Sequence, residues 1–240
     1  MPRWRSSRQP PAWAPDGTQI AYIRLDPFAG GPTINVIGLE GGESTEVAED
    51  ASAPRWSPDG DRIAFMSVDG GMNQLTAPPP SELRVVNADG TGLATLADAS
   101  PYAGPPAWSP DGASIAVTGG SETESTIDVV DVGSGAVTTL AGMEDAILVE
   151  PAWAPDGRHV PFVISTAAIF SSEAAIGVVP AEGGEIERLG ALDNAYFMSP
   201  AWSPDGAWLA RCVAPGWRWP PTLSSSIGKP AKTQSWRRAS

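Results

Sequence analysis

Few side chains in this chain could carry out covalent chemistry. The 240 residues contain one histidine, His159, and one cysteine, Cys212. Several imidazoles therefore cannot meet at a metal within one chain, and a Ser-His-Asp triad would have to use His159. No Gly-x-Ser-x-Gly nucleophile motif occurs, and residues 133–135 (Gly-Ser-Gly) are better explained as a hairpin turn. We expect no enzyme, a surface position for His159 and a thiol without function at Cys212.

Carboxylates are abundant, with 28 Asp and Glu, but they do not predict a metal site. Some recur in one type of turn and are explained by turn geometry. Eight others lie in connecting segments, where a calcium ion would need six to eight oxygen ligands converging on one point. No loop has the alternating Asp/Asn spacing of an EF-hand. We assign no metal ligand and no cofactor.

The recurring aspartates belong to a phrase that occurs five times, Pro-Ala/Arg-Trp-Ser/Ala-Pro-Asp-Gly. Its Trp, Asp and Gly positions are Trp13, Asp16, Gly17; Trp56, Asp59, Gly60; Trp108, Asp111, Gly112; Trp153, Asp156, Gly157; and Trp202, Asp205, Gly206. The tryptophans are 43, 52, 45 and 49 residues apart, a period typical of stacked supersecondary units. We interpret the tryptophans as core residues, and Asp-Gly as the residues that form a turn.

The second copy illustrates what one repeat builds. A short strand ends at Trp56, a turn follows at 57–60, and an alternating strand resumes at 63–65. A third strand is predicted at 82–86 and a fourth at 93–96. Four antiparallel strands per repeat make one blade of a β-propeller.

The other copies follow this pattern, with two departures. Third and fourth strands are predicted at 33–37 and 45–47, at 126–130 and 137–140, and at 175–179 and 186–189. In the fourth copy, Pro161 removes a hydrogen-bond donor from the second strand. In the fifth copy, Arg211 would point a charge into the blade core, and no third or fourth strand can be read after it. We therefore predict an all-β propeller of four complete blades plus a partial fifth, in an incomplete ring.

The phrase Trp-Ser/Ala-Pro-Asp-Gly followed by Ile-Ala-Phe/Tyr/Val resembles the PD40, WD40-like propeller repeat. That repeat is found in TolB-like proteins, in tricorn-type proteases and in the propeller halves of prolyl-oligopeptidase-family peptidases. The resemblance covers about residues 9–210 and implies a non-catalytic scaffold that binds a protein or peptide. Two alternatives stay open: a propeller domain severed from a prolyl-oligopeptidase-type hydrolase, where it would position substrate, or a degenerate fragment without function.

Charge divides the chain into three segments. Residues 1–8 form a basic lead, residues 9–210 the propeller, and residues 211–240 a basic tail that we expect to be disordered. All 28 acidic residues lie at or before Asp205, whereas the tail holds six basic residues and no acidic one. The acidic balance argues against a nucleic-acid partner, and no apolar run is long enough to span a membrane. The resemblance implies a periplasmic or extracellular protein, but no signal peptide precedes the first repeat, which indicates the cytoplasm.

A propeller of this kind has one face with uniform turns and one with variable loops. The turns after each Trp and those between the third and fourth strands share the first face, and all other connections lie on the opposite face. Loops on a rigid scaffold often carry recognition, and aromatic residues are favoured at interfaces. We predict partner contacts at Asp69, Met72, Asn73, Gln74, Tyr102, Asn194, Tyr196 and Phe197. The incomplete ring also leaves an edge through which copies of the chain could associate.

Overall fold

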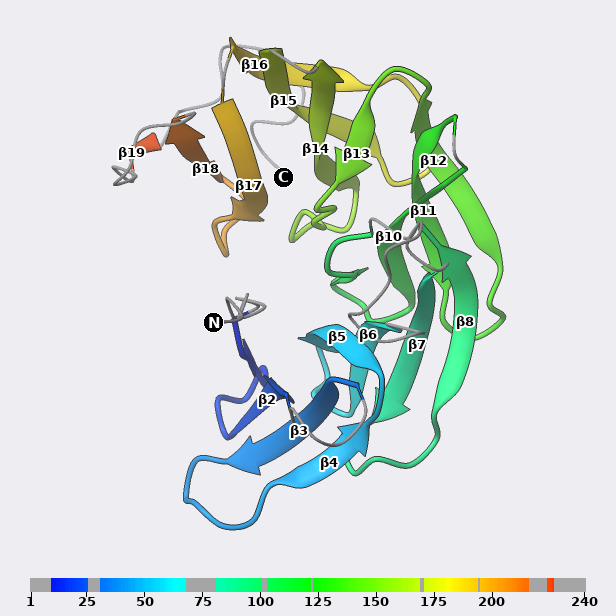
Figure 1. Cartoon of the computed structure of the whole chain (residues 1–240), viewed down its shortest axis with the longest axis vertical. Coiled ribbons are helices and arrows are strands. Elements are labelled where there is room, and N and C mark those ends of the chain that lie inside the picture. Colours follow the sequence, from blue (N-terminus) through cyan, green and yellow to red (C-terminus); the bar gives the residue numbers. More distant parts are fainter. Residues whose placement is uncertain are drawn as a thin grey trace, which may run out of the picture.

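The fold is an open arc of five antiparallel β-sheets. The computed structural model describes residues 10–25, 31–67, 81–100, 103–121, 123–168, 171–193, 195–215 and 224–226. Within these residues every regular element is a strand, and no helix could cross a membrane. Figure 1 shows the sheets side by side around a central space, with the first and last sheets at the two ends of the arc. The predicted propeller, four complete blades and a partial fifth in an open ring, is confirmed.

The strands of each blade follow one another in sequence from the centre outward. Blade 1 contains β1 (Ala12–Trp13), β2 (Gln19–Arg24), β3 (Thr33–Gly38) and β4 (Thr45–Ala48). Blade 2 contains β5 (Ala51–Trp56), β6 (Arg62–Ser67), β7 (Ser81–Asn87) and β8 (Ala94–Ala99). Blade 3 contains β9 (Ala107–Trp108), β10 (Ser114–Gly120), β11 (Ser125–Asp131) and β12 (Val137–Met143). Blade 4 contains β13 (Ile147–Val149), β14 (His159–Ala168), β15 (Ser171–Pro180) and β16 (Glu187–Asp193), and blade 5 contains β17 (Ala195–Trp202), β18 (Leu209–Pro215) and β19 (Ser224–Ser226).

Blade 5 has one strand more than the sequence predicts. The short strand β19 pairs with β18, with Arg211 opposite Ser226 and Val213 opposite Ser224. The expectation that no third strand follows Arg211 is therefore wrong. A run of three serines has no apolar alternation, so the pattern that reveals the other strands is missing. The side chain of Arg211, predicted to point into the blade core, lies outside what the structure describes.

The recurring Asp-Gly pair closes the first hairpin of each blade, as predicted. The Oδ1 atom of Asp59 accepts hydrogen bonds from Ser57 Oγ at 2.5 Å and from the backbone N–H of Asp61 at 3.1 Å. Gly60 adopts a left-handed φ of 79°, a conformation that costs glycine little. The Ser57 hydroxyl also accepts the N–H of Arg62 at 2.9 Å. The same Asx geometry recurs at Asp16, Asp111, Asp156 and Asp205.

Tryptophan joins neighbouring blades. The indole Nε1 of Trp56 donates to the carbonyl of Ala12 at 3.0 Å, and that of Trp108 donates to the carbonyl of Arg55 at 3.0 Å. Both rings are buried, at 8% and 9% exposure. The apolar clusters also lie between blades: Trp56 belongs to one that combines residues of blades 1 and 2, such as Ile34 and Phe65. The predicted core role of these two tryptophans is confirmed.

Arg62 adds a polar contact to the junction between blades 2 and 3. Its guanidinium carbon lies 5.2 Å from the centroid of the Trp108 ring, a cation–π distance. Its Nη2 also donates to the carbonyl of Gly112 at 3.5 Å. One arginine of blade 2 thus contacts both the tryptophan and the turn glycine of blade 3.

The other three tryptophans differ from the prediction that all are core residues. Trp13 is 58% exposed, because among the described residues no blade precedes blade 1 to cover it. Trp153 and Trp202 are half-buried. The Nε1 of Trp153 is itself buried, but it has no hydrogen-bond partner among the described residues.

Pro161 accounts for the irregular start of blade 4. Ala152 donates its N–H to the carbonyl of Pro161 at 2.9 Å, but a proline has no N–H to return. Residues 152–153 are accordingly not part of a strand, although the equivalent Ala-Trp or Arg-Trp pairs of the other four blades are. The predicted loss of a ladder donor therefore loosens the segment that carries Trp153.

We predict that Trp108→Phe lowers the free energy of unfolding by about 1 kcal/mol, because it removes a buried hydrogen bond between blades. Trp153→Phe removes the same atoms but no such bond, so its effect is expected to be smaller. Chemical denaturation followed by circular dichroism measures both. Equal losses for the two variants would contradict the role of the indole hydrogen bond.

We also predict that the contribution of the turn aspartates to the stability of the fold depends on pH. The hydrogen bond from the Ser57 hydroxyl, and next that from the N–H of Asp61, lower the pKa of Asp59 below its ordinary 3.8. A lowered folded-state pKa contributes stability above the unfolded-state value, and this contribution disappears as pH falls through the folded-state value. Asp59→Asn should therefore destabilise the protein at neutral pH and much less in strong acid. Asp61→Asn is the control, because the side chain of Asp61 makes no hydrogen bond to a described residue; thermal melts across pH distinguish the two.

Candidate functional site

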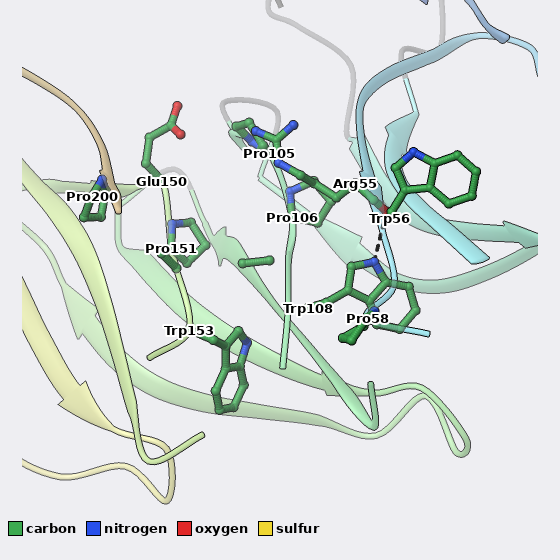
Figure 2. A pocket seen from close by; sticks show the side chains of 12 residues that line it. Arg55, Trp56, Pro58, Pro105, Pro106, Trp108, Glu150, Pro151, Trp153 and Pro200 are labelled. Atoms are coloured by element: carbon green, nitrogen blue, oxygen red, sulfur yellow. Dashed lines mark hydrogen bonds between the residues drawn. The ribbon is translucent and has the colours of Figure 1, made fainter. Parts of the chain in front are cut away.

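A pocket of about 340 Å³ opens among the inner strands of blades 2 to 5. Its lining residues are Arg55, Trp56, Pro58, Pro105, Pro106, Ala107, Trp108, Glu150, Pro151, Ala152, Trp153 and Pro200. Figure 2 shows Glu150, Pro151 and Pro200 on one side of this central pocket, Trp56 and Trp108 on the other, and Pro105 and Pro106 between them. The residues come from β5 and the turn after it, from β9 and the two residues before it, from the segment that follows β13, and from β17. The repeat itself therefore brings them together.

Prolines form much of the wall. Pro106, Pro151 and Pro200 occupy the same place in three copies of the repeat, two residues before the tryptophan, and all three are buried. A proline ring is rigid and has no N–H, so this wall offers apolar surface together with backbone carbonyl groups.

Arg55 is the cation of the pocket. The other four repeats have alanine at this position, namely Ala12, Ala107, Ala152 and Ala201. The side chain is half-buried, and its Nη1 donates to the carbonyl of Pro54 at 2.9 Å. Burial lowers the pKa of Arg55, and the negative charge of Glu150 opposes this shift. Among the described residues the guanidinium makes no other hydrogen bond, which leaves N–H donors for a ligand.

Glu150 supplies the carboxylate of the pocket. Its φ of 56° is left-handed, a conformation that is costly for a residue with a side chain and is often found at functional sites. Ala53, at the equivalent place in blade 2, has a φ of 55° and lies in the bulge of β5. A Cβ on Gly104 would lie 3.2 Å from the Oε1 of Glu150, so this glycine leaves room for the carboxylate.

The lining of the pocket is apolar apart from two charged side chains. It combines one guanidinium and one carboxylate with proline, tryptophan and alanine, and includes no histidine, cysteine, serine or threonine. Among the residues that the structure describes, no three His, Cys, Asp or Glu side chains converge as a metal site would require. The arrangement can hold a ligand through charge-assisted hydrogen bonds and apolar contact.

Two further pockets lie off the centre. One of about 360 Å³ lies on the variable-loop face, between the β10–β11 and β12–β13 connections, and carries Glu124, Glu144 and Asp145. The other, of about 200 Å³, lies between the first turns of blades 4 and 5. It contains His159, half-buried at the start of β14, whose Nδ1 is 3.8 Å from the Oδ2 of Asp156.

The residues predicted as partner contacts are mostly outside the described part of the chain. This applies to Asp69, Met72, Asn73, Gln74, Tyr102 and Asn194. Tyr196 and Phe197 lie on strand β17 instead of in a loop, opposite Ala214 and Val213, because β17 continues beyond the bulge between Met198 and Ala201. The prediction missed Arg55 and Glu150. Arg55 could have been identified from the sequence, because arginine replaces the alanine of the other four repeats. No local feature of the sequence distinguishes Glu150 from the other acidic residues.

The fold is that of a β-propeller whose inner strands surround a central pocket. The model of the PD40 family, the TolB beta propeller domain, matches residues 80–214, more than half of the chain. The chain belongs to this family, and the resemblance found in the repeats is confirmed.

Solved structures support the same fold. A putative TolB from Agrobacterium tumefaciens is 22% identical with a TM-score of 0.64, over 87% of this chain and 70% of that one. TolB from Acinetobacter baumannii is 19% identical with a TM-score of 0.66, over 93% of this chain and 54% of that one. The β-propeller domain of the Trilobed protease from Pyrococcus furiosus, described as having an open velcro topology, is 20% identical with a TM-score of 0.62, over 92% of this chain and 69% of that one. This chain thus spans about half the length of the Acinetobacter protein, and no curated protein matched it significantly.

Proposed function

We propose that this protein is a non-catalytic binding scaffold that takes a segment of a protein or peptide into its central pocket. The observation that carries the proposal is Arg55, which replaces the repeat's alanine and places a half-buried guanidinium beside a proline wall. Glu150 lies in the same pocket and adds a negative charge to it.

The ligand's charge and shape follow from this lining. A carboxylate, from an acidic side chain or a C-terminus, would pair with the guanidinium of Arg55 in a bidentate manner. Half-burial strengthens such a pair relative to one in open water. The apolar part of the segment would pack on Pro106, Pro151 and Pro200.

The partner is proposed to approach from the variable-loop face. Pro105 and Glu150 precede the tryptophans of their blades and therefore lie toward that end of the inner strands. The acidic side chains around Glu124 and Asp145 would favour basic groups elsewhere on the same partner.

A second candidate function is that of a propeller domain severed from a prolyl-oligopeptidase-type hydrolase. The likeness to the propeller of the Pyrococcus protease favours it. In that case the central pocket would position a peptide for a catalytic domain. An adjacent peptidase reading frame would support this candidate, whereas a neighbouring Tol–Pal gene set would support the scaffold.

Other copies of the chain are the second class of partner that we propose. The open arc leaves one side of blade 1 and one side of blade 5 without a neighbouring sheet among the described residues.

We predict that peptides selected from a random display library against the full chain depend on Arg55. In fluorescence anisotropy, Arg55→Ala should weaken their binding by about tenfold or more, because a hydrogen bond to a charged group is lost. Arg158→Ala, which removes an exposed arginine of the blade 4 turn, should leave binding unchanged.

The selected peptides provide a matched ligand test. Amidation of the C-terminus, or Gln in place of a peptide Glu, should weaken binding to the natural chain and make little difference to Arg55→Ala. Peptides that bind both proteins equally, or that lose nothing when their carboxylate is removed, would overturn the proposed site.

A further inference from the structure

The contact between neighbouring blades is built from parts that recur around the arc. The first part, found at the first two junctions, is the indole hydrogen bond, from Trp56 to the Ala12 carbonyl and from Trp108 to the Arg55 carbonyl, both at 3.0 Å. In each case the acceptor is the residue immediately before the tryptophan of the preceding blade.

The second part is contact between the turns. A Cβ on the turn glycine of one blade would meet the Cδ of the turn proline of the preceding blade, within 4 Å, at every junction. The pairs are Gly60 with Pro15 at 3.7 Å, Gly112 with Pro58 at 3.6 Å, Gly157 with Pro110 at 3.9 Å and Gly206 with Pro155 at 3.9 Å. The junctions therefore share one geometry, in which the later blade offers glycine and the earlier blade offers proline.

Blade 1 offers the later-blade half of this contact, and no described residue packs against it. Trp13 is 58% exposed, and a Cβ on Gly17 would meet nothing within 4 Å. Ile20 and Tyr22 are only half-buried, whereas the equivalent residues of blade 2, Ile63 and Phe65, are fully buried.

Blade 5 offers the earlier-blade half. Ala201 precedes Trp202 and therefore corresponds to the acceptors Ala12 and Arg55. Pro204 corresponds to the prolines that receive a glycine, and both Ala201 and Pro204 are exposed. Among the described residues no later blade covers this side, and Figure 1 shows the two sheets at opposite ends of the arc.

We propose that a second copy of the chain completes this contact, with blade 1 of one copy packed on blade 5 of the other. Trp13 would donate its indole N–H to the Ala201 carbonyl, and Gly17 would lie against Pro204. This contact specifies the self-association named among the proposed partners and does not involve the central pocket. Because its two halves differ, the contact is head-to-tail, and it extends into longer assemblies unless the rotation closes a ring.

Solution mass tests the proposal. Multi-angle light scattering of the natural chain should show a mass that rises with protein concentration. Trp13→Ala should weaken association by about tenfold or more, since tryptophan anchors dominate many interfaces. Trp13→Phe, which keeps an apolar ring but has no donor, should lie between the two. Leu93→Ala is the control, because Leu93 has the same 58% exposure but lies in the outer turn of blade 2.

A mixing experiment tests the head-to-tail order. Pro204→Lys places a long charged side chain where Gly17 would pack, so this variant and Trp13→Ala should each be monomeric. Each retains the half that the other lacks, and a mixture of the two should therefore form dimers and nothing larger. Near-UV circular dichroism confirms that the variants are folded.

Three results would overturn the proposal: a natural chain that stays monomeric at all concentrations, association that survives both variants, or association that Leu93→Ala abolishes equally. Binding of the selected peptides should be unaffected by Trp13→Ala. If Trp13→Ala abolishes association but still binds the peptides, both proposals are supported. If the natural chain does not associate but binds the peptides, only the head-to-tail contact fails. If it associates but binds no peptide through Arg55, only the proposed function fails.

Discussion

The arrangement of the sheets depends on the contact that each blade makes with the blade before it. At every junction a turn glycine lies beside the turn proline of the preceding blade, and at the first two junctions a tryptophan indole also donates to a carbonyl of that blade. A single four-stranded sheet cannot bury both faces, and its neighbours must cover them. The indole does this with its ring and fixes the register of two blades with its N–H, as Trp56 and Trp108 do. Blade 4 differs from this pattern. Next to Pro161, residues 152–153 are not part of a strand, and the indole of Trp153 has no hydrogen bond to a described residue.

The central pocket is a product of the same repeat. The prolines two residues before the tryptophans line it because every repeat brings its inner strand to the centre. Against this uniform background two departures supply the charge: arginine in place of alanine at position 55, and a left-handed glutamate at position 150. A repeated scaffold can thus acquire a specific site through one or two substitutions, because the surrounding wall is already present.

The sequence was sufficient to predict the blades, and the reason is physical. Asp-Gly turns, alternating strands and a period near 45 residues are local signals, and the predicted third and fourth strands of blades 1 to 4 overlap those observed. Three results depended on longer-range structure. Trp13 is exposed because no described blade covers it. Strand β19 has no hydrophobic pattern and is recognised only by its pairing with β18. Arg55 and Glu150 line the same pocket because blades 2 to 4 curve around the centre. Tyr196 and Phe197 were misplaced because a bulge lets β17 extend into what reads as a loop.

The direction of the indole hydrogen bonds bears on how the chain emerges from a ribosome. Trp56 and Trp108 donate to carbonyls 44 and 53 residues earlier in the sequence, so each acceptor has already been synthesised when its tryptophan appears. At roughly 5–20 residues per second, a new blade is completed every few seconds. Each hairpin is local and can form in microseconds, which is far faster than the next repeat is translated. The propeller can therefore be assembled vectorially, with every finished blade serving as the template on which the following one docks.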